Sequence, residues 1–240
     1  MRLFLINICC LYFCFACQLK KAVEDKKAFV SEAIAQLEEI AADTIPLAKE
    51  SVPKEVHDTD FVDLLDYTDQ IAYDFRYADT NNFIHEKVYP CVQCLLRKEV
   101  ALALVQANAS LLSKGYRLRL FDCYRPLSVQ HKMWAIYPDG RYVANPNTSG
   151  SIHNRGGAVD VTLELLNGSI VDMGTDFDHF GKEAHTSYTS FGQDIIQHRK
   201  LLQKAMLAAG FSPLKTEWWH FNFGKSKKYS ISNVPFDCAK

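Results

Sequence analysis

A helical pattern followed directly by a strand pattern is the feature that most constrains the fold of this chain. Apolar side chains recur at helical spacing over residues 95–114, and Gly115 is typical of the end of a helix. Over residues 116–124 the pattern becomes an alternation, which predicts a buried strand. One side of this strand is expected to carry Leu118, Leu120 and Asp122. The other side is expected to carry Arg117, Arg119 and Phe121.

Further helix and strand patterns follow along the chain, and no internal repeat is present. Helices are expected over residues 128–136 and 193–209, and residues 138–150 are expected to form a loop because they are rich in Gly, Pro, Asn and Ser. Strands are expected over residues 61–65, 71–77, 158–165 and 218–223. This order predicts an α+β fold with a small, largely antiparallel sheet flanked by helices.

Composition narrows the class of protein. The chain has 240 residues, of which 48% are hydrophobic and 23% charged, so a globular protein is expected and a disordered or collagen-like one is excluded. Lys and Arg number 27 and Asp and Glu 28, a formal net charge of -1. We therefore expect no nucleic-acid partner, because binding phosphates needs a basic surface.

The first residues have the pattern of an export signal. Arg2 precedes an apolar stretch that ends at Cys17, so residues 1–17 are predicted to be a signal peptide. A lipoprotein anchored through a lipid on Cys17, plain secretion and an uncleaved anchor are the alternatives. The protein is accordingly expected in the periplasm or on a membrane, attached through that lipid alone.

Three segments are expected along the chain. After residues 1–17, residues 18–58 are expected to form an N-terminal helix, over about 22–42, and a spacer with two prolines. The spacer would hold the domain away from a membrane, and the alternative is that the helix packs on the domain. Residues 59–240 are expected to form the main domain.

Half of the eight cysteines lie in the export segment, and Cys91, Cys94, Cys123 and Cys238 remain in the body. In an exported protein these four can pair as disulfides. Cys91 and Cys94 also have the spacing of half a zinc site or of a thiol-redox motif, but no second pair with that spacing exists. Structural disulfides or buried thiols are therefore favoured, and the pairing is left open.

Two short stretches offer ligands for a metal ion. His153 and Asp160 lie in the first, and His220 lies in the second, three residues after Glu217. Three nitrogen or oxygen ligands that leave one position to water are typical of a catalytic zinc site, whereas structural sites close all four positions. Glu217 is the candidate general base. A regular strand would point Glu217 and His220 to opposite faces, so we expect a bulge or twist between them.

The two stretches together resemble the zinc D-alanyl-D-alanine peptidases, and among them the dipeptidases of the VanX type. The first stretch has the pattern Ser-x-His-x-x-Gly-x-Ala-x-Asp at residues 151–160, and the second has Glu-x-Trp-His at residues 217–220. The resemblance covers about residues 60–236 in the order of that family. Three other stretches that match the subgroup are residues 74–78, 122–126 and 173–178.

The resemblance implies a ligand set and a catalytic pair. His153, Asp160 and His220 would bind one Zn²⁺ per chain. Glu217 would be the general acid and base. Arg125 would stabilise the oxyanion of the transition state, where a fixed cation acts strongly.

The resemblance also implies a small D,D-dipeptide, D-alanyl-D-alanine, as the substrate. Asp178 would receive its free amino group, and Ser151 and Tyr77 would lie near its ends. A longer or N-terminally blocked peptide would leave the carboxylate of Asp178 unpaired, so its binding would be weaker.

Two other functions remain open from the sequence. The same zinc core could serve a D,D- or L,D-carboxypeptidase or an endopeptidase that acts on peptidoglycan stem peptides. A zinc-stabilised binding module without turnover belongs to another class, and the presence of both Glu217 and Arg125 argues against it.

Overall fold

The computed structural model describes residues 24, 31–32 and 55–239 of the chain. The predicted signal peptide and nearly all of the predicted helix and spacer lie outside these residues. Val56–Lys240 forms one compact unit. Within the part of the chain that the structure describes, no helix combines the length and the apolar character needed to cross a membrane.

A five-stranded sheet forms the centre of this unit, with the order β2-β4-β5-β7-β6. β2 pairs in parallel with β4, and the other neighbours pair antiparallel. The strands are β2 (Ala72–Tyr73), β4 (Tyr116–Asp122), β5 (Ala158–Leu165), β6 (Phe211–Pro213) and β7 (His220–Phe223). A second sheet pairs β1 (Phe61–Asp63) with β3 (Leu95–Arg97). The predicted α+β fold with a largely antiparallel sheet is confirmed.

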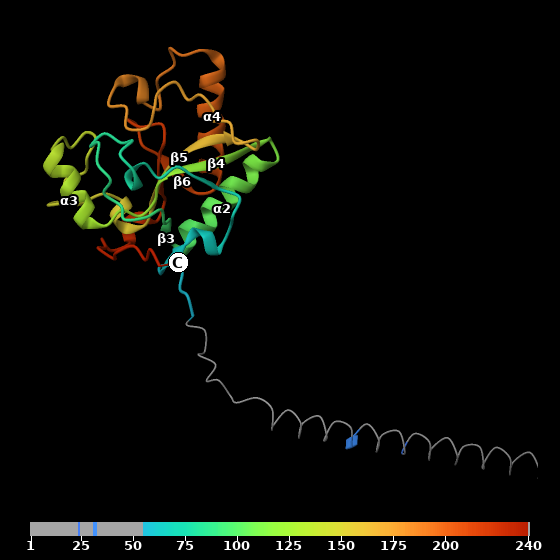
Figure 1. Ribbon diagram of the computed structural model, residues 1–240. Helices are drawn as coiled ribbons and strands as arrows, with labels where there is room; N and C mark the ends of the chain where they lie inside the picture. Colours follow the sequence, from blue (N-terminus) through green and yellow to red (C-terminus); the bar gives the residue numbers. More distant parts are fainter. Residues whose placement is uncertain (1–23, 25–30, 33–54, 240) are drawn as a thin grey trace, which may run out of the picture. The chain divides into compact units, whose positions relative to one another are not determined.

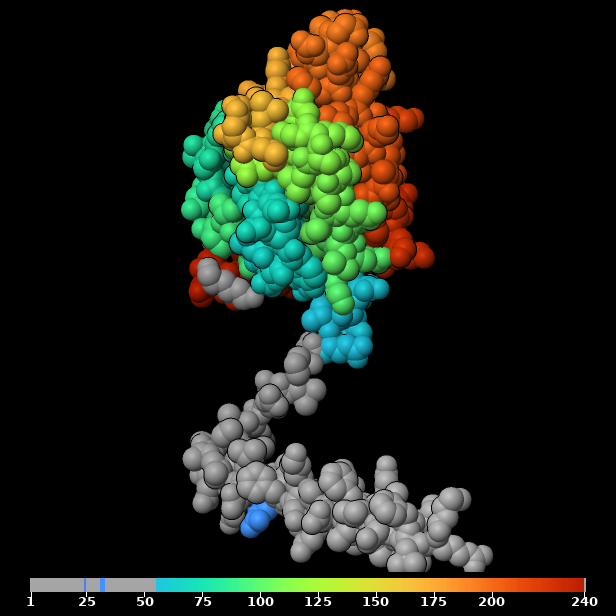
Figure 2. Space-filling view, turned by 90° about the vertical axis from the view of Figure 1, so that its right-hand side faces the viewer, coloured from blue at the N-terminus to red at the C-terminus, as the bar shows by residue number. Residues whose placement is uncertain are grey.

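Three helices accompany the sheets in the described residues: α2 (Lys98–Leu112), α3 (Leu127–Ile136) and α4 (Gln193–Ala208). α2 and α4 contact each other, and they pack on β4, β5 and β6. In Figure 1, β4 and β5 lie between α3 on the left and α2 on the right. Figure 2 shows the first residues of the unit, in blue and turquoise, against the green surface of residues 100–120. Five short 3₁₀ turns are η1 (Leu64–Asp66), η2 (Arg76–Ala78), η3 (His153–Arg155), η4 (Lys182–Ala184) and η5 (Ser226–Lys228).

Several predicted bounds were wrong, because pairing between distant segments overrides local periodicity. The helix expected from residue 95 begins at Lys98, since Leu95–Arg97 pairs with β1. The strand expected over 71–77 ends at Tyr73, and Arg76–Ala78 forms a 3₁₀ turn instead. β7 begins at His220 rather than at residue 218, and β6 was not predicted.

A bulge in β4 changes the side to which Asp122 points. Leu120 pairs with Val161, but Asp122 pairs with Asp160, so one residue is extra between them. Residues directly opposite each other share a face of the sheet. Asp122 therefore lies on the face of Asp160, and its expected grouping with Leu118 and Leu120 was wrong.

β5 is buried on both faces although its side chains alternate between two kinds. Val159, Val161 and Leu163 belong to the apolar core. Asp160, Thr162 and Glu164 point the other way, and they are 3%, 2% and 0% exposed. A buried polar face must find partners for its charges, and the functional residues gather on it.

Candidate active site

Three side chains converge on one point at the end of β5. His153 Nε2 lies 3.1 Å from His220 Nδ1, His220 Nδ1 lies 3.0 Å from Asp160 Oδ1, and His153 Nε2 lies 3.3 Å from Asp160 Oδ2. All three residues are buried. Among the described residues they form the group of metal-ligating side chains whose donor atoms lie within 4.8 Å of one another.

The spacing of these donors fits a single metal ion. Zinc binds nitrogen and oxygen at about 2.0–2.2 Å, so tetrahedral ligands around it lie about 3.3 Å apart. The distances of 3.0–3.3 Å between the three donors agree with this geometry. Two imidazoles and one carboxylate are also donors that zinc prefers.

The hydrogen bonds of the two rings direct lone pairs toward that point. His153 Nδ1 lies 2.6 Å from the carbonyl oxygen of Cys123, which can only accept, so this nitrogen carries the hydrogen. His220 Nε2 lies 3.0 Å from Asn222 Oδ1, an acceptor for its N–H. With the hydrogen of each ring on the other nitrogen, His153 Nε2 and His220 Nδ1 would present their lone pairs to a metal, the arrangement of metal-binding histidines.

The electrostatics of the group favour positive charge between the donors. Burial alone would raise the pKa of Asp160, but His153 and His220 more than offset it and hold that pKa below its usual value. Burial alone would lower the pKa of His153, and Asp160 raises it above its usual value. A divalent cation supplies that charge to all three side chains at once.

The backbone that carries the ligands follows from the local sequence. His153 begins the 3₁₀ turn His153–Arg155, which ends at Gly156 with φ of 67°. A side chain at Gly156 would meet the ring of Phe61 at 2.3 Å, so the turn needs glycine. Asp160 lies on β5 directly opposite His220, the first residue of β7. Strand pairing therefore brings together ligands that are far apart in the sequence.

Glu217 lies beside the donors, before β7 rather than on it. Its Oε2 is 4.0 Å from His220 Nδ1. Residues 218 and 219 bend the chain ahead of the strand, which meets the predicted need for an irregular backbone between Glu217 and His220. Burial raises the pKa of Glu217 to about 8. A carboxylate whose pKa lies near neutrality is suited to both accept and return a proton.

Arg125 is held rigidly at the edge of the same site. Its Nε and Nη2 donate to Asp122 Oδ2 at 3.0 and 2.6 Å, and its Nη1 donates to Gln130 Oε1 at 3.0 Å. Its Nη2 is 3.9 Å from Asp160 Oδ2, and the guanidinium lies 5.0 Å from the centre of the Tyr77 ring. A guanidinium fixed by three hydrogen bonds can stabilise developing negative charge without reorganisation.

Asp178 faces the site from the loop after β5 in an unusual backbone conformation. Its φ is 60°, which few residues other than glycine adopt. The hydroxyl of Tyr77 donates to both of its carboxylate oxygens at 3.2 Å. Desolvation, together with repulsion from Asp160, raises the pKa of Asp178 to about 8. Among the described residues, the carboxylate of Asp178 forms no ion pair, and its hydrogen-bond donors are Tyr77 and the backbone N–H of Phe83.

All eight side chains predicted from the sequence line one cavity of about 270 Å³. Ser151 lies at its edge, where its hydroxyl accepts a hydrogen bond from the backbone N–H of His153 at 3.2 Å. The cavity is smaller than the roughly 300–1,000 Å³ of pockets for drug-sized ligands. Its size indicates a small substrate.

Sequence reasoning missed two parts of this site. Asp122, the partner of Arg125, lies three residues before it on the bulged strand, and that spacing was the available signal. Phe83, Tyr142 and Phe180 form an aromatic wall of the cavity, with the rings of Tyr142 and Phe180 stacked at 4.4 Å. They come from three separate loops, so no local pattern could reveal them.

The comparison with known proteins agrees with this arrangement. Residues 57–237 match the M15 peptidases, in a family described as D-ala-D-ala dipeptidase. The chain belongs to this family. As an M15 peptidase it is a metallopeptidase, so the hypothesis of a binding module without turnover was wrong.

Named relatives of this M15 peptidase match it over most of their own length. A D-alanyl-D-alanine dipeptidase of Escherichia coli (strain K12) is 33% identical over 180 residues, which are 75% of this chain and 93% of that protein. One of Enterococcus faecalis (strain V583) is 33% identical over 171 residues, 63% of this chain and 85% of that protein. Among solved structures, the LD-carboxypeptidase LdcB matches 56% of this chain and 62% of its own at 21% identity, with a TM-score of 0.36.

Proposed function

We propose that this M15 peptidase hydrolyses the dipeptide D-alanyl-D-alanine to two D-alanines, with one Zn²⁺ per chain held by His153, Asp160 and His220. One observation carries the proposal. The three donors lie 3.0–3.3 Å apart in a cavity that Glu217, Arg125 and Asp178 also line. The three metal ligands, the general base Glu217, the cation of Arg125 and the amine acceptor Asp178 thus surround one small cavity. The curated relatives of this family bear the name of the same activity.

Glu217 is the proposed proton carrier. Zn²⁺ bound at such a site lowers the pKa of a coordinated water to about 7 and polarises a carbonyl group. Glu217 accepts a proton from the attacking water while the water oxygen bonds to the scissile carbonyl carbon. It then returns the proton to the nitrogen of the leaving D-alanine as the carbon–nitrogen bond breaks. The pKa of about 8 supports both steps.

Arg125 is proposed to act on the oxygen of the scissile carbonyl. Negative charge develops on that oxygen as water attacks, and the guanidinium is already fixed by Asp122 and Gln130. Preorganised donors of this kind cost no rearrangement at the moment of reaction. Asp122 therefore supports the proposal as the residue that orients Arg125.

Asp178 is proposed to select a free dipeptide. An ammonium group would supply the charge partner that Asp178 lacks, and Tyr77 would hold the carboxylate in place from the other side. A peptide with a blocked or extended N-terminus would desolvate Asp178 without pairing it, which is costly. The aromatic wall of Phe83, Tyr142 and Phe180 lines the same small cavity.

A metal analysis combined with two hydrolysis assays tests this function on the chain from residue 18 onward. We expect one Zn²⁺ per chain, and hydrolysis of D-alanyl-D-alanine that a chelator abolishes and Zn²⁺ restores. N-acetyl-D-alanyl-D-alanine should be hydrolysed far more slowly. Preference for the acetylated dipeptide or for stem peptides would support the carboxypeptidase or endopeptidase alternative. A chain that is active without metal would refute the proposal.

We also propose that the protein is exported. Cys91 is bonded to Cys238, and Cys94 is bonded to Cys123. Two disulfides are typical of an oxidising compartment, which supports the export signal predicted for residues 1–17. Cell fractionation of the full chain, with labelling for a lipid on Cys17, would distinguish a secreted form from an anchored one.

A further inference from the structure

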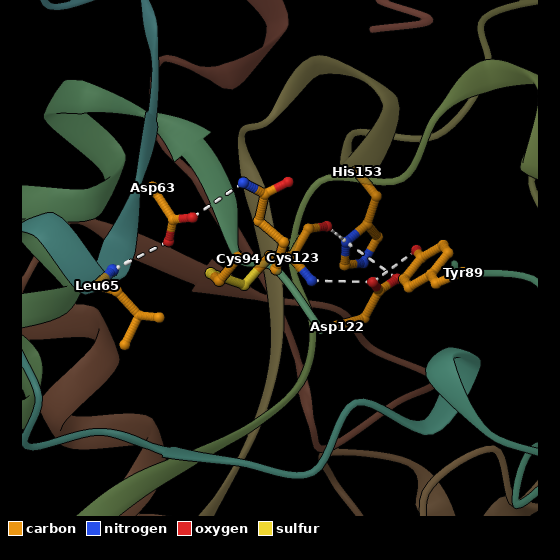
Figure 3. Close-up of a disulfide and its surroundings, with 8 residues drawn as sticks. Asp63, Leu65, Tyr89, Cys94, Asp122, Cys123 and His153 are labelled. Carbon is orange, nitrogen blue, oxygen red and sulfur yellow. Dashed lines mark hydrogen bonds and ion pairs between the residues drawn. A yellow bond between two sulfur atoms is a disulfide. The ribbon is translucent and has the colours of Figure 1, made fainter. Parts of the chain in front are cut away.

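The dipeptide Asp122–Cys123, at the end of β4, makes two contacts with the site and one covalent bond on the side away from it. The Asp122 carboxylate accepts hydrogen bonds from Arg125. The Cys123 carbonyl oxygen accepts one from His153 Nδ1 at 2.6 Å, and the Cys123 sulfur is bonded to Cys94. Figure 3 shows the disulfide on one side of the Cys123 backbone and the His153 ring on the other.

The carbonyl of Cys123 determines which nitrogen of His153 can bind a metal. Because a carbonyl only accepts, Nδ1 must carry the hydrogen, and Nε2 is left with its lone pair toward Asp160 and His220. The same bond sets the tilt of the ring. Outer partners of this kind orient metal-binding histidines and raise their basicity.

The pairing of β4 with β5 does not extend to this carbonyl. β4 ends at Asp122, and the bulge between Leu120 and Asp122 disturbs its last pairs. The N–H of Cys123 donates to the side chain of its own neighbour Asp122, at 2.9 Å, rather than to another strand. The N–H of Tyr124, in the same planar peptide unit as this carbonyl, donates to the carbonyl of Leu95 at 3.1 Å, so one hydrogen bond to β3 fixes the unit.

The disulfide supplies a covalent anchor at this point. Cys94 directly precedes β3, and its carbonyl accepts a hydrogen bond from the N–H of Leu64 at 2.9 Å. Both Cys94 and Cys123 are fully buried. The bond therefore ties the end of β4, which belongs to the five-stranded sheet, to the sheet formed by β1 and β3.

We propose that the Cys94–Cys123 disulfide positions the Cys123 carbonyl, and through it the imidazole of His153, for metal binding. The inference rests on the zinc site of the proposed function. Cys94 and Cys123 are thus positioning residues of the active site, in addition to any contribution to stability.

The second disulfide of the chain, which is more exposed, is the control for loss of a covalent link. Cys91–Cys238 joins residues 147 positions apart, against 29 for Cys94–Cys123, and neither of its residues lines the cavity. Constraint of the unfolded chain increases with the length of the closed loop. If the disulfides acted here only by constraining the unfolded chain, loss of Cys91–Cys238 should weaken the protein at least as much.

The experiment compares two variants of the full chain, Cys94→Ala/Cys123→Ala and Cys91→Ala/Cys238→Ala. Zn²⁺ affinity is measured by competition with a chromophoric chelator, at a temperature where circular dichroism shows both variants folded. We expect the first variant to bind Zn²⁺ about 10- to 100-fold more weakly, the usual cost of losing an outer partner of a ligand. The control should bind Zn²⁺ as the unmodified chain does.

A spectroscopic measurement separates positioning from stability. In the Zn²⁺-loaded protein, the Nδ1–H proton of His153 should give a protected nuclear magnetic resonance signal in the unmodified chain and in the control. That signal should be lost or exchange faster in the Cys94→Ala/Cys123→Ala variant. If this variant does not fold, Cys94→Val/Cys123→Ala refills the buried volume and takes its place.

The outcomes separate this inference from the proposed function. Unchanged Zn²⁺ affinity and an unchanged His153 signal in a folded Cys94→Ala/Cys123→Ala protein would overturn the positioning role alone. Equal losses in both variants would also overturn it, because the disulfides would then act through stability. An unmodified chain that binds no Zn²⁺ would overturn the proposed function together with this inference.

Discussion

β5 carries two buried carboxylates, Asp160 and Glu164, four residues apart on the same face. They differ in the groups that pair with their negative charge. Glu164 is fully buried, and it accepts hydrogen bonds from Arg117, whose Nε lies 2.7 Å away, and from Arg119. Asp160 is also buried, but its partners are the imidazoles of His153 and His220. Guanidinium groups are always charged, whereas neutral imidazoles present lone pairs.

This difference separates a structural carboxylate from a functional one. Burying a charge is costly unless it is paired. The protein pairs Glu164 with its own cations, so that end of β5 is complete without a ligand. Around Asp160 three ligand atoms face one another at 3.0–3.3 Å, and a cation from outside the chain would pair with them. The same strand thus carries a carboxylate paired by the protein at one end and a proposed metal ligand at the other.

The largest effect should come from Glu217→Gln, which keeps the shape of the side chain but removes the proton acceptor. We expect kcat for D-alanyl-D-alanine to fall by about 10³-fold or more, within the range that general acid–base catalysis supplies. Zn²⁺ binding, measured by chelator competition, should persist, because Glu217 is not one of the three proposed ligands. An active, Zn²⁺-loaded variant would eliminate Glu217 as the base.

Asp160→Asn tests the functional end of β5. Replacing the carboxylate by an amide removes the negative charge between two imidazoles. We expect Zn²⁺ affinity to fall by more than the roughly 100-fold that loss of an outer partner costs. Isothermal titration calorimetry measures the affinity. Tight Zn²⁺ binding by this variant would place the metal elsewhere.

Glu164→Gln tests the structural end and should show the opposite behaviour. Breaking a buried ion pair costs about 3–5 kcal/mol, and we expect about 3 kcal/mol here because Arg117 and Arg119 are 31% and 20% exposed. Urea denaturation measures the loss, and Zn²⁺ affinity should not change. Glu86→Gln, which breaks an exposed pair with Lys132, is the control and should cost less than about 1 kcal/mol. Equal losses in the two variants would contradict the contrast.

The same strand shows how far the sequence alone could predict the fold. Residues 158–165 were predicted with the observed bounds, because their β-rich pattern and their burial agree. The start of α2 was missed by three residues, because Leu95–Arg97 pairs with a segment more than thirty residues earlier in the chain. Such pairing leaves no trace in local periodicity.

The site also contains residues that the sequence could predict and residues that it could not. Residues in short strings, such as His153 and Asp160, could be proposed as ligands because turn glycines and strand spacing place them together. The face of Asp122 depends on a bulge, which alternation does not reveal. The pairing of Cys94 with Cys123 could not be deduced either, because four cysteines allow three pairings. Only the folded backbone decides among these.

Asp178 extends the comparison to a third carboxylate, for which the ammonium group of the proposed substrate would be the cation. Its pKa of about 8 in the folded protein lies well above the value near 4 of an unfolded aspartate. Between these values the folded state keeps a proton that the unfolded state has released, so stability falls as pH rises.

Asp178→Asn removes this penalty without backbone strain, since asparagine tolerates the φ of 60°. In metal-free protein, the variant should gain stability over the unmodified chain from pH 5 to pH 8, by at most about 1.4 kcal/mol per pH unit. Thermal unfolding at several pH values measures the gain. Asp176→Asn, at an exposed position two residues earlier, is the control and should show none. A gain that does not depend on pH would mean that Asp178 is already ionised in the folded protein, and the substrate's ammonium would then not be needed to complete it.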